Sequence, residues 1–437
     1  MHRGWIDIYK IMVSLLVGLI ISLPVLQVQA QEPVCGLPFE SVSTPLDELG
    51  SREYIRMDGQ ATGFAGGLYP QGSNSRPTAH EEAGLDLASQ IVPLGFNGNP
   101  DPTNGKIVLM SIGMSNTNAE FGAFMDLANS DKEINPQLFL LNGALGGQTS
   151  ERWLDPNAIA WQELERLLER NKISTQQVQV AWVKLSQTRG GDFPEKALAL
   201  QDDLEIIVQH LQDKFSNLKM VYLSSRTRSY TYWRGLSPEP VAFETGFAVK
   251  WLIEKQIQGD PALNYNPAGG EVRAPYLSWG PYLWIDGLNP RADGLVWSAE
   301  DMTEDCTHPS KSGQVKVGQM LLEFFKTDSL ARSWFLAGQE VELSLTRPVM
   351  TPSSPAVLTS SPQPTPSGTP GLSAEVHWTA PVPLVTNTET ATAPSESQSG
   401  MNLPIAVLFL VGVVALLAVT FGGYHALRKK DQTIGQS

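Results

Sequence analysis

Residues 106–116 read Lys106-Ile-Val-Leu-Met-Ser-Ile-Gly-Met-Ser115-Asn116, and this stretch decides the fold. A continuous apolar run rich in β-branched residues is typical of a strand buried on both faces of a parallel sheet. The run ends at Gly113, and Ser115 follows where the chain leaves the strand. Residues beyond the carboxyl end of such a strand lie where open α/β sheets bind ligands. Ser115 is therefore either a turn residue or a nucleophile.

Further apolar runs follow this strand, and helical patterns separate them. The clearest helical pattern places one apolar residue on the same face every three or four positions between Leu200 and Phe215. Strands separated by helices predict βαβ units, and hence one α/β domain with a five-stranded parallel sheet. The predicted strands cover 106–112, 137–141, 178–185, 218–223 and 276–285, and further helices are expected at 81–91, 157–171, 241–257 and 313–325.

The composition excludes several classes of function. The 437 residues are 42% hydrophobic, which is enough to bury a full core. A net charge of −14 argues against a nucleic-acid partner, because such partners require a basic surface. The chain has two cysteines and six scattered histidines without metal-ligand spacing, so we expect no metal and no cofactor.

The two ends of the chain predict a membrane-anchored protein. Residues 1–30 have the basic start, apolar run and small final residue of a cleaved signal peptide; an uncleaved anchor is the alternative. Residues 403–424 form an apolar run long enough to span a bilayer, and Arg428-Lys-Lys430 follows it. Positive charge favours the cytoplasmic side, so we expect a cytoplasmic tail at 425–437 and an extracytoplasmic main domain at the cell membrane.

Between these ends, three segments differ in composition. Residues 31–104 are rich in Gly, Pro and Asn and predict an irregular lead-in. Residues 105–338 hold the alternating strands and helices. Residues 347–400 are rich in Pro, Ser and Thr, which is typical of an extended linker.

Polar residues follow the predicted strands in a particular order. Gly113-Met114-Ser115 comes first, Asn142 and Gly147 follow the second strand, and Asp305-Cys-Thr-His308-Pro309 precedes the last helix. This order resembles that of the SGNH hydrolases (GDSL-type esterases and lipases) over about residues 106–325. Gly113-Met-Ser-Asn116 is also similar to the Gly-Gln-Ser-Asn block of sialate O-acetylesterase-like carbohydrate esterases. The resemblance implies a flavodoxin-like three-layer α/β/α sandwich.

The resemblance also implies a role for each of these residues. Ser115 would be the nucleophile, and His308 would be the base that takes its proton. Asp305 would orient His308 and stabilise the imidazolium. The backbone N–H groups of Ser115 and Gly147 would face the oxyanion of the transition state.

The sequence departs from the family pattern at two places. Met114 stands where the family usually has Asp, and the Asn of the third block is missing after the strand at 178–185. Lys184 or Gln187 would replace that Asn as an oxyanion donor. A Lys at the end of a strand is otherwise a solvated charge, and the missing Asn is also compatible with an inactive site.

Cys35 and Cys306 are the only cysteines of the chain. In an oxidising compartment they would form a disulfide between the start of the chain and the loop that holds Asp305 and His308. Two free buried cysteines are the alternative.

The stretch 230–297 is rich in aromatic residues. These side chains would either stack on sugar rings beside the site or pack in the core of an enlarged domain. Seven of these aromatic residues are Tyr230, Tyr232, Trp233, Tyr276, Trp279, Tyr282 and Trp284.

The sequence thus predicts a membrane-anchored serine esterase that removes acyl groups, above all acetyl, from carbohydrate through an acyl-serine intermediate. A hydrolase of lipid or small esters is a second hypothesis. The third is a catalytically inactive SGNH-like domain that serves as a surface binding module. The expected partners are an acylated carbohydrate or lipid ester as substrate and the membrane through the C-terminal helix.

Overall fold

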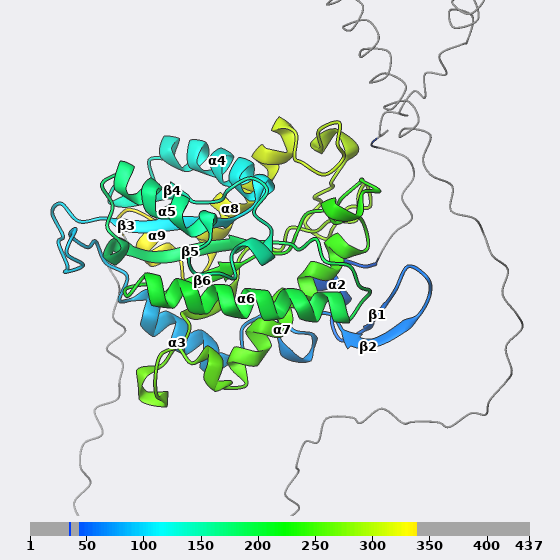
Figure 1. Cartoon of the computed structure of the whole chain (residues 1–437), viewed down its shortest axis with the longest axis horizontal. Coiled ribbons are helices and arrows are strands. Elements are labelled where there is room, and N and C mark those ends of the chain that lie inside the picture. The colour runs from blue at the N-terminus through cyan, green and yellow to red at the C-terminus, as the bar shows by residue number, and fades with distance from the viewer. Residues whose placement is uncertain (1–34, 36–42, 339–437) are drawn as a thin grey trace, which may run out of the picture. The chain divides into compact units, whose positions relative to one another are not determined.

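The computed structural model describes residue 35 and residues 43–338 (Figure 1). The signal peptide, linker, membrane span and cytoplasmic tail predicted from the sequence lie outside these residues. Within the described part, no helix combines the length and apolar character that crossing a bilayer requires.

Five parallel strands form the central sheet, in the spatial order β4-β3-β5-β6-β7. In chain order this is 2-1-3-4-5, the flavodoxin-like arrangement, whose ligand crevice lies where the first and third strands adjoin. That place is the junction of β3 and β5, where Gly113 pairs with Lys184. The predicted five-stranded parallel sheet is confirmed. The strands are β3 (Ile107–Gly113), β4 (Leu138–Asn142), β5 (Val178–Lys184), β6 (Met220–Leu223) and β7 (Tyr276–Trp279).

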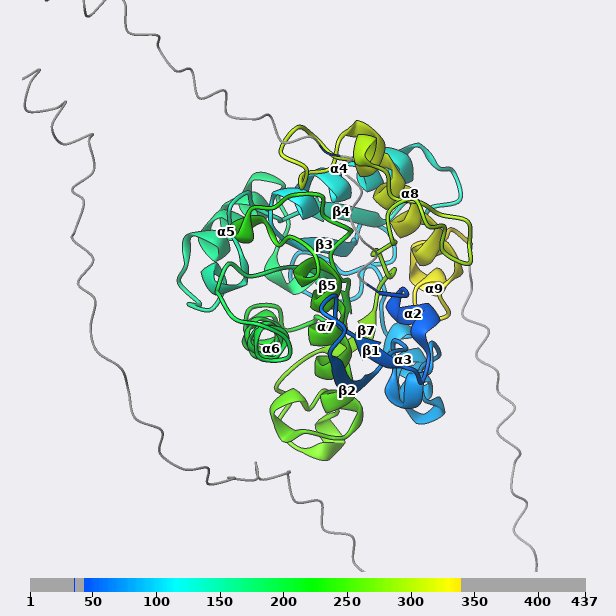
Figure 2. The same cartoon turned by 90° about the vertical axis from the view of Figure 1, so that its right-hand side faces the viewer.

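Helices cover both faces of this sheet, as Figure 2 shows. Val108 and Met110 of β3 pack into one apolar core, whereas Ile107 and Leu109 pack into the other. Because alternate residues of a strand point to opposite faces, a strand buried on both sides is apolar throughout. One face carries α5 (Ile159–Arg170), α6 (Glu195–Lys214) and α7 (Val241–Ile257); the other carries α3 (Thr78–Ala88), α4 (Ser115–Ser130), α8 (Lys311–Thr327) and α9 (Arg332–Phe335).

The lead-in is more regular than its composition predicts. It contains α2 (Leu46–Leu49) and an antiparallel pair, β1 (Glu53–Ile55) and β2 (Ala61–Ala65). Tyr54 of β1 is fully buried, and its ring packs edge-on against Phe193. The expectation of irregular structure is therefore wrong here, because burial of Tyr54 stabilises two strands that are too short to show a period. The short 3-10 helices within the described residues are η1 (Pro70–Gly72), η2 (Ser150–Arg152), η3 (Thr175–Gln177), η4 (Arg234–Leu236), η5 (Pro261–Leu263), η6 (Pro267–Gly269) and η7 (Ala299–Asp301).

Two helices, α4 and α8, pack closely against each other, and this contact positions the site. A Cβ atom on Gly318 of α8 would lie 2.9 Å from the backbone N of Phe124 and 3.0 Å from the backbone carbon of Ala123. Only a glycine therefore allows the two backbones to approach this far. Ser115 is the first residue of α4 and His308 lies three residues before α8, so the close contact fixes both residues relative to each other.

Candidate active site

Ser115 occupies the first position of α4, directly beyond the carboxyl end of β3. The turn between strand and helix is tight, because a side chain on Gly113 would overlap Thr117 and the carbonyl oxygen of Lys184. Thr117 Oγ1 donates a hydrogen bond to that carbonyl, at 2.8 Å. The start of α4 is thus hydrogen-bonded to the end of β5. Ser115 lies beyond the carboxyl ends of the strands, where it was predicted.

His308 lies beside Ser115 and completes a chain of three side chains. Ser115 Oγ is 2.6 Å from His308 Nε2, and His308 Nδ1 is hydrogen-bonded to Asp305 Oδ2. With the Nδ1 proton directed to the carboxylate, Nε2 is the ring atom that accepts the serine proton. The structure therefore brings together the three residues that the sequence singled out for catalysis.

Asp305 is held as an anion by its own loop. Its Oδ1 accepts hydrogen bonds from the backbone N–H groups of Thr307 and His308, at 3.0 and 2.8 Å, and from Thr303 Oγ1 at 2.9 Å. Partial burial alone would raise its pKa, but these hydrogen bonds outweigh burial and lower the pKa of Asp305 to about 2. The carboxylate is thus ionised at any pH at which a serine hydrolase works.

The loop of Asp305 and His308 is fixed from two sides. Asn116, which is buried and follows the serine, donates from Nδ2 to the carbonyl oxygen of Thr307 at 2.8 Å. From the other side, Cys306 forms a disulfide with Cys35 across 271 residues. Of the two alternatives for the cysteines, the structure has the bridge. Cys306 adopts a left-handed backbone conformation with φ of 61°, which turns the loop between Asp305 and His308.

The glycine loop after β4 lies against the serine. A Cβ atom on Gly146 would be 3.8 Å from the Cβ of Ser115, whereas one on Gly147 would meet nothing within 4 Å. Gly147 has φ of +74° and sits in a turn closed by a hydrogen bond from the N–H of Gln148 to the carbonyl of Leu145, at 3.2 Å. The predicted Gly147 thus provides the turn, and its neighbour Gly146 lies beside Ser115.

Two asparagines hold this loop beside α4. Asn142 Nδ2 donates to the carbonyl of Asn118 at 2.8 Å, and its Oδ1 accepts from Ser111 Oγ at 2.9 Å. Asn118 Nδ2 in turn donates to the carbonyl of Ala144, at 2.7 Å. Asn142 therefore supports the loop through its side chain. The N–H groups at the start of α4, together with the helix dipole, provide positive potential beside Ser115 Oγ.

Lys184 has a different environment from either one predicted for it. Its side chain is 2% exposed, and its ammonium group pairs with both carboxylate oxygens of Glu120 on α4. The expectation of a solvated charge is wrong, because the end of β5 lies under α4. The alternative expectation was an oxyanion donor, but the Lys184 ammonium group donates its hydrogen bonds to Glu120. We therefore assign Lys184 to the support of α4.

Several supporting residues were not found from the sequence. Glu120 pairs with the ammonium group of Lys184 at the end of β5, and Thr117 donates to the carbonyl of the same residue. Arg226, which is buried after β6, donates to Thr307 Oγ1 at 3.4 Å. The whole of α4 was also missed, because polar and small residues interrupt its apolar face. The spacing of Phe121, Phe124 and Ala128 was the available signal.

The seven aromatic residues singled out between 230 and 297 divide into two groups. Core packing accounts for five of the seven side chains, and only Tyr232 and Trp233 are exposed, by 66% and 71%. The buried ones are Tyr230, Tyr276, Trp279, Tyr282 and Trp284.

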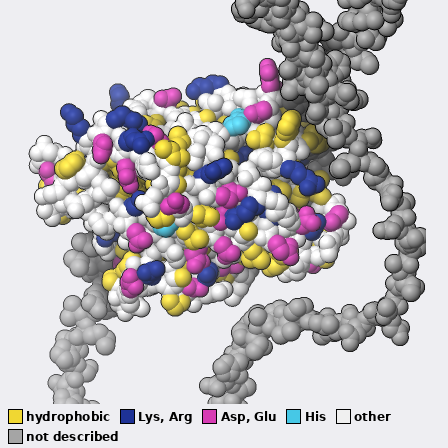
Figure 3. Space-filling model, in the orientation of Figure 1, with side chains coloured by type: hydrophobic (Ala, Val, Ile, Leu, Met, Phe, Trp, Pro, Cys, Tyr) yellow, Lys and Arg dark blue, Asp and Glu magenta, His cyan; other side chains and the backbone are white. Residues whose placement is uncertain are grey.

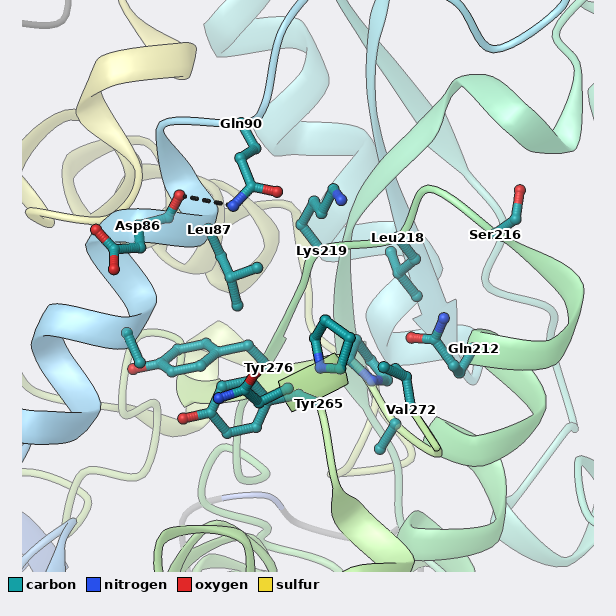
Figure 4. A pocket seen from close by; sticks show the side chains of 15 residues that line it. Asp86, Leu87, Gln90, Gln212, Ser216, Leu218, Lys219, Tyr265, Val272 and Tyr276 are labelled. Atoms are coloured by element: carbon teal, nitrogen blue, oxygen red, sulfur yellow. Dashed lines mark hydrogen bonds between the residues drawn. The ribbon is translucent and has the colours of Figure 1, made fainter. Parts of the chain in front are cut away.

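A cavity of about 520 Å³ lies at the opposite end of the sheet from Ser115 (Figure 4). Leu218 and Lys219, just before β6, and Tyr276, the first residue of β7, line it together with Leu87 of α3. Since these are the amino ends of the strands, the cavity is separate from the candidate active site. The face in Figure 3 carries acidic and basic side chains interspersed, without the continuous basic patch of a nucleic-acid interface.

Within the described residues, no group of three or more His, Cys, Asp or Glu side chains is arranged to hold a metal ion.

Comparison with known proteins gives structural neighbours only. No family profile and no curated protein matches the chain. Similar solved structures include a candidate SGNH hydrolase from Slackia heliotrinireducens (12% identity, TM-score 0.30, 50% of this chain and 99% of that one). An acylhydrolase candidate from Bacteroides fragilis covers 57% of this chain and 96% of its own (13% identity, TM-score 0.29). The catalytic domain of Streptococcus pneumoniae peptidoglycan O-acetyltransferase A has 13% identity and TM-score 0.27, over 51% and 94% of the two chains. The functional proposal rests on the geometry of the site.

Proposed function

We propose that the protein is a serine esterase that cleaves acyl esters through an acyl-Ser115 intermediate. The observation that carries this proposal is the hydrogen-bonded chain from Ser115 Oγ through His308 to Asp305. A serine hydroxyl is a weak nucleophile on its own, and a positioned general base accelerates its attack by about 10²–10⁴-fold. Here the base lies 2.6 Å from the hydroxyl and has an ionised carboxylate behind it.

The reaction follows from these positions. Ser115 Oγ attacks the ester carbonyl carbon while its proton passes to His308 Nε2, and Asp305 stabilises the resulting imidazolium. His308 then gives this proton to the alkoxide oxygen as the bond to the alcohol breaks. A water molecule attacks the acyl-serine in the second half, again with His308 as base, and releases the carboxylic acid. Ser115 and His308 return to their initial protonation states.

The oxyanion of each tetrahedral intermediate needs hydrogen-bond donors. We assign this role to the backbone N–H of Ser115, at the start of α4, and to the N–H groups of the glycine turn with Gly146 and Gly147. One such donor lowers the barrier by roughly 3–4 kcal/mol. The position of Gly146 beside Ser115 supports this assignment.

We further propose that the domain acts outside the cytoplasm, on acetyl esters of carbohydrate, and is anchored by the segment at 403–424. The disulfide between Cys35 and Cys306 supports an oxidising compartment, since cytosolic thiols are kept reduced. The exposed Tyr232 and Trp233 support a carbohydrate substrate.

Turnover of p-nitrophenyl acetate by the full-length protein tests the esterase proposal. Ser115→Ala should reduce the rate to background, and Ser130→Ala, at the far end of the same helix, should leave it unchanged. Equal background rates in wild type and Ser115→Ala would instead identify a non-catalytic domain. A preference for p-nitrophenyl acetate over longer acyl chains is expected for a deacetylase, and the reverse order would indicate a lipid esterase.

A further inference from the structure

The loop at 229–237 exposes two adjacent aromatic side chains. Four large apolar side chains in the described part of the chain are more than 60% exposed, and Tyr232 and Trp233 are two of them. A third, Leu288 at 73%, lies on a second loop, which is joined by hydrogen bonds to the loop at 229–237. Tyr230 Oη donates to the carbonyl of Trp297, and the N–H of Trp297 donates to the carbonyl of Gly287, next to Leu288, at 2.7 Å.

This loop is held directly against the residues between Asp305 and His308. The N–H of Tyr230 donates to the carbonyl of Cys306 at 2.9 Å, and Thr307 Oγ1 donates to the carbonyl of Leu236 at 2.9 Å. Trp233 lies between these two contacts, and its carbonyl accepts a hydrogen bond from the N–H of Leu236 at 2.9 Å. The position of Trp233 is therefore fixed relative to the acid–base loop of the site.

We propose that Tyr232 and Trp233 form an aromatic platform that binds a sugar ring of the substrate while its acyl ester reaches Ser115. This inference rests on the proposed esterase function and names the substrate class. The C–H groups on one face of a pyranose carry partial positive charge and match the negative face of an aromatic ring. Sugar hydroxyls at the rim would meet the exposed Arg234 and Asn289.

The composition of the surface favours a sugar over an acyl chain or a lipid surface. Leu288 is the one aliphatic residue among the three exposed apolar side chains, and Arg234 and Asn289 lie beside them. A groove for acyl chains would be lined by aliphatic residues and would exclude charged groups. Two planar rings with polar neighbours are the arrangement that an amphipathic sugar ring requires.

The test compares two esters in the full-length protein. The substrates are p-nitrophenyl acetate and a panel of partially O-acetylated xylo-, chito- and manno-oligosaccharides. The variants are Tyr232→Ala/Trp233→Ala and, as a matched control, Phe96→Ala, an aromatic residue that is 67% exposed in the segment leading to the amino end of β3. We expect the double variant to raise KM for at least one acetylated oligosaccharide by about tenfold, because both ring faces that contact the sugar are lost. Its turnover of p-nitrophenyl acetate and all kinetics of Phe96→Ala should stay at the wild-type level.

The outcomes separate the two proposals. An unchanged KM across the panel, or turnover of p-nitrophenyl acetate without turnover of any oligosaccharide, would overturn the platform and leave the esterase in place. If wild type cleaves neither ester, the esterase proposal fails, and the platform is tested by calorimetric binding of the unacetylated oligosaccharides. Binding by wild type that is lost in the double variant supports the platform, and no binding by wild type overturns it. Loss of binding to phosphatidylcholine vesicles in the double variant, with KM unchanged, would assign the aromatic pair to a lipid surface instead.

Discussion

Ser115 Oγ and His308 Nε2 lie 2.6 Å apart although 193 residues separate them in the chain. Ser115 is the first residue of α4, and His308 lies three residues before α8. These two helices pack so closely at Gly318 that no side chain fits between their backbones. The contact on which the proposed chemistry depends is thus a consequence of helix packing. Changes that loosen this packing should lower activity before they unfold the domain.

Asn116→Ala should lower kcat for p-nitrophenyl acetate by at least about tenfold, because it removes the bond from α4 to the carbonyl of Thr307. That carbonyl would lose a buried partner, so we also expect the free energy of unfolding to fall by about 1–3 kcal/mol. Steady-state kinetics and urea denaturation measure the two effects. Asn104→Ala, at an exposed position, is the control and should change neither. Full activity in Asn116→Ala would show that the loop of His308 needs no support from α4.

The pH dependence of kcat/KM should show one ionisation on its acid limb. Folding lowers the pKa of Asp305 from 3.8 to about 2, so Asp305 stays ionised until the pH falls to about 2. The carboxylate therefore contributes to stability above its unfolded pKa, and this contribution is lost as the pH falls through about 2. The acid limb should then contain no second ionisation from this carboxylate, and its slope in a log plot should be about one. A slope of about two, with a second ionisation at the ordinary pKa of an aspartate, would contradict this assignment.

Asp305→Asn should lower kcat by roughly 10⁴-fold, because an amide cannot stabilise the imidazolium and favours the wrong tautomer of His308. Since the Asp305 side chain is 42% exposed and the Asn side-chain oxygen can still accept hydrogen bonds from the loop, the same change should lower stability far less than activity. Kinetics and a melting curve on the same sample separate the two. A loss of activity that is explained by unfolding at the assay temperature would argue against a catalytic role for Asp305.

Removing the disulfide should destabilise the protein and loosen the loop of His308. The bridge closes a loop of 271 residues, and loss of such a native bridge costs about 2–5 kcal/mol. We expect Cys35→Ser/Cys306→Ser to melt at a lower temperature and to have reduced kcat. Dithiothreitol should have the same effect on wild type and none on the double variant. If reduction leaves the melting temperature of wild type unchanged, the bridge does not support the fold.

Lys184→Met should destabilise the domain by about 3–5 kcal/mol, since it leaves the carboxylate of Glu120 buried without its partner. Adding Glu120→Leu should recover part of this loss, because two apolar side chains then replace the pair. Denaturation of the single and double variants measures the coupling. If Lys184→Met instead lowers kcat at unchanged stability, Lys184 is the oxyanion donor that the family resemblance suggested.

The sheet could be predicted from the sequence because its strands are buried on both faces. Val108 and Leu109 face opposite cores, so the strand is apolar throughout and stands out in the sequence. Tyr54 shows the opposite case, since its short strand is stabilised by distant residues such as Phe193. Helix α4 was missed for a related reason. Polar residues that support the site, such as Asn116 and Glu120, take buried positions of this helix that apolar residues would otherwise occupy.

The sequence identified the residues of the candidate site by their type and order, but it did not identify the residues that hold them in place. Ser115, Asp305 and His308 follow a recurrent order along the chain. The pairing of Lys184 with Glu120 joins residues 64 positions apart, and nothing in the local sequence of either residue indicates the other. For the same reason the sequence could not distinguish Gly146, which approaches Ser115, from Gly147, which forms the turn.

The most direct test of the central claim is to label the nucleophile covalently and to identify the residue that carries the label. The full-length protein is treated with a fluorophosphonate probe, and the adduct is located by peptide mass spectrometry. We expect one adduct, on Ser115, which is absent in Ser115→Ala, strongly slowed in His308→Ala and unaffected by Ser130→Ala. Labelling of Ser115→Ala at the wild-type rate, or an adduct on another residue, would contradict the assignment of Ser115 as nucleophile.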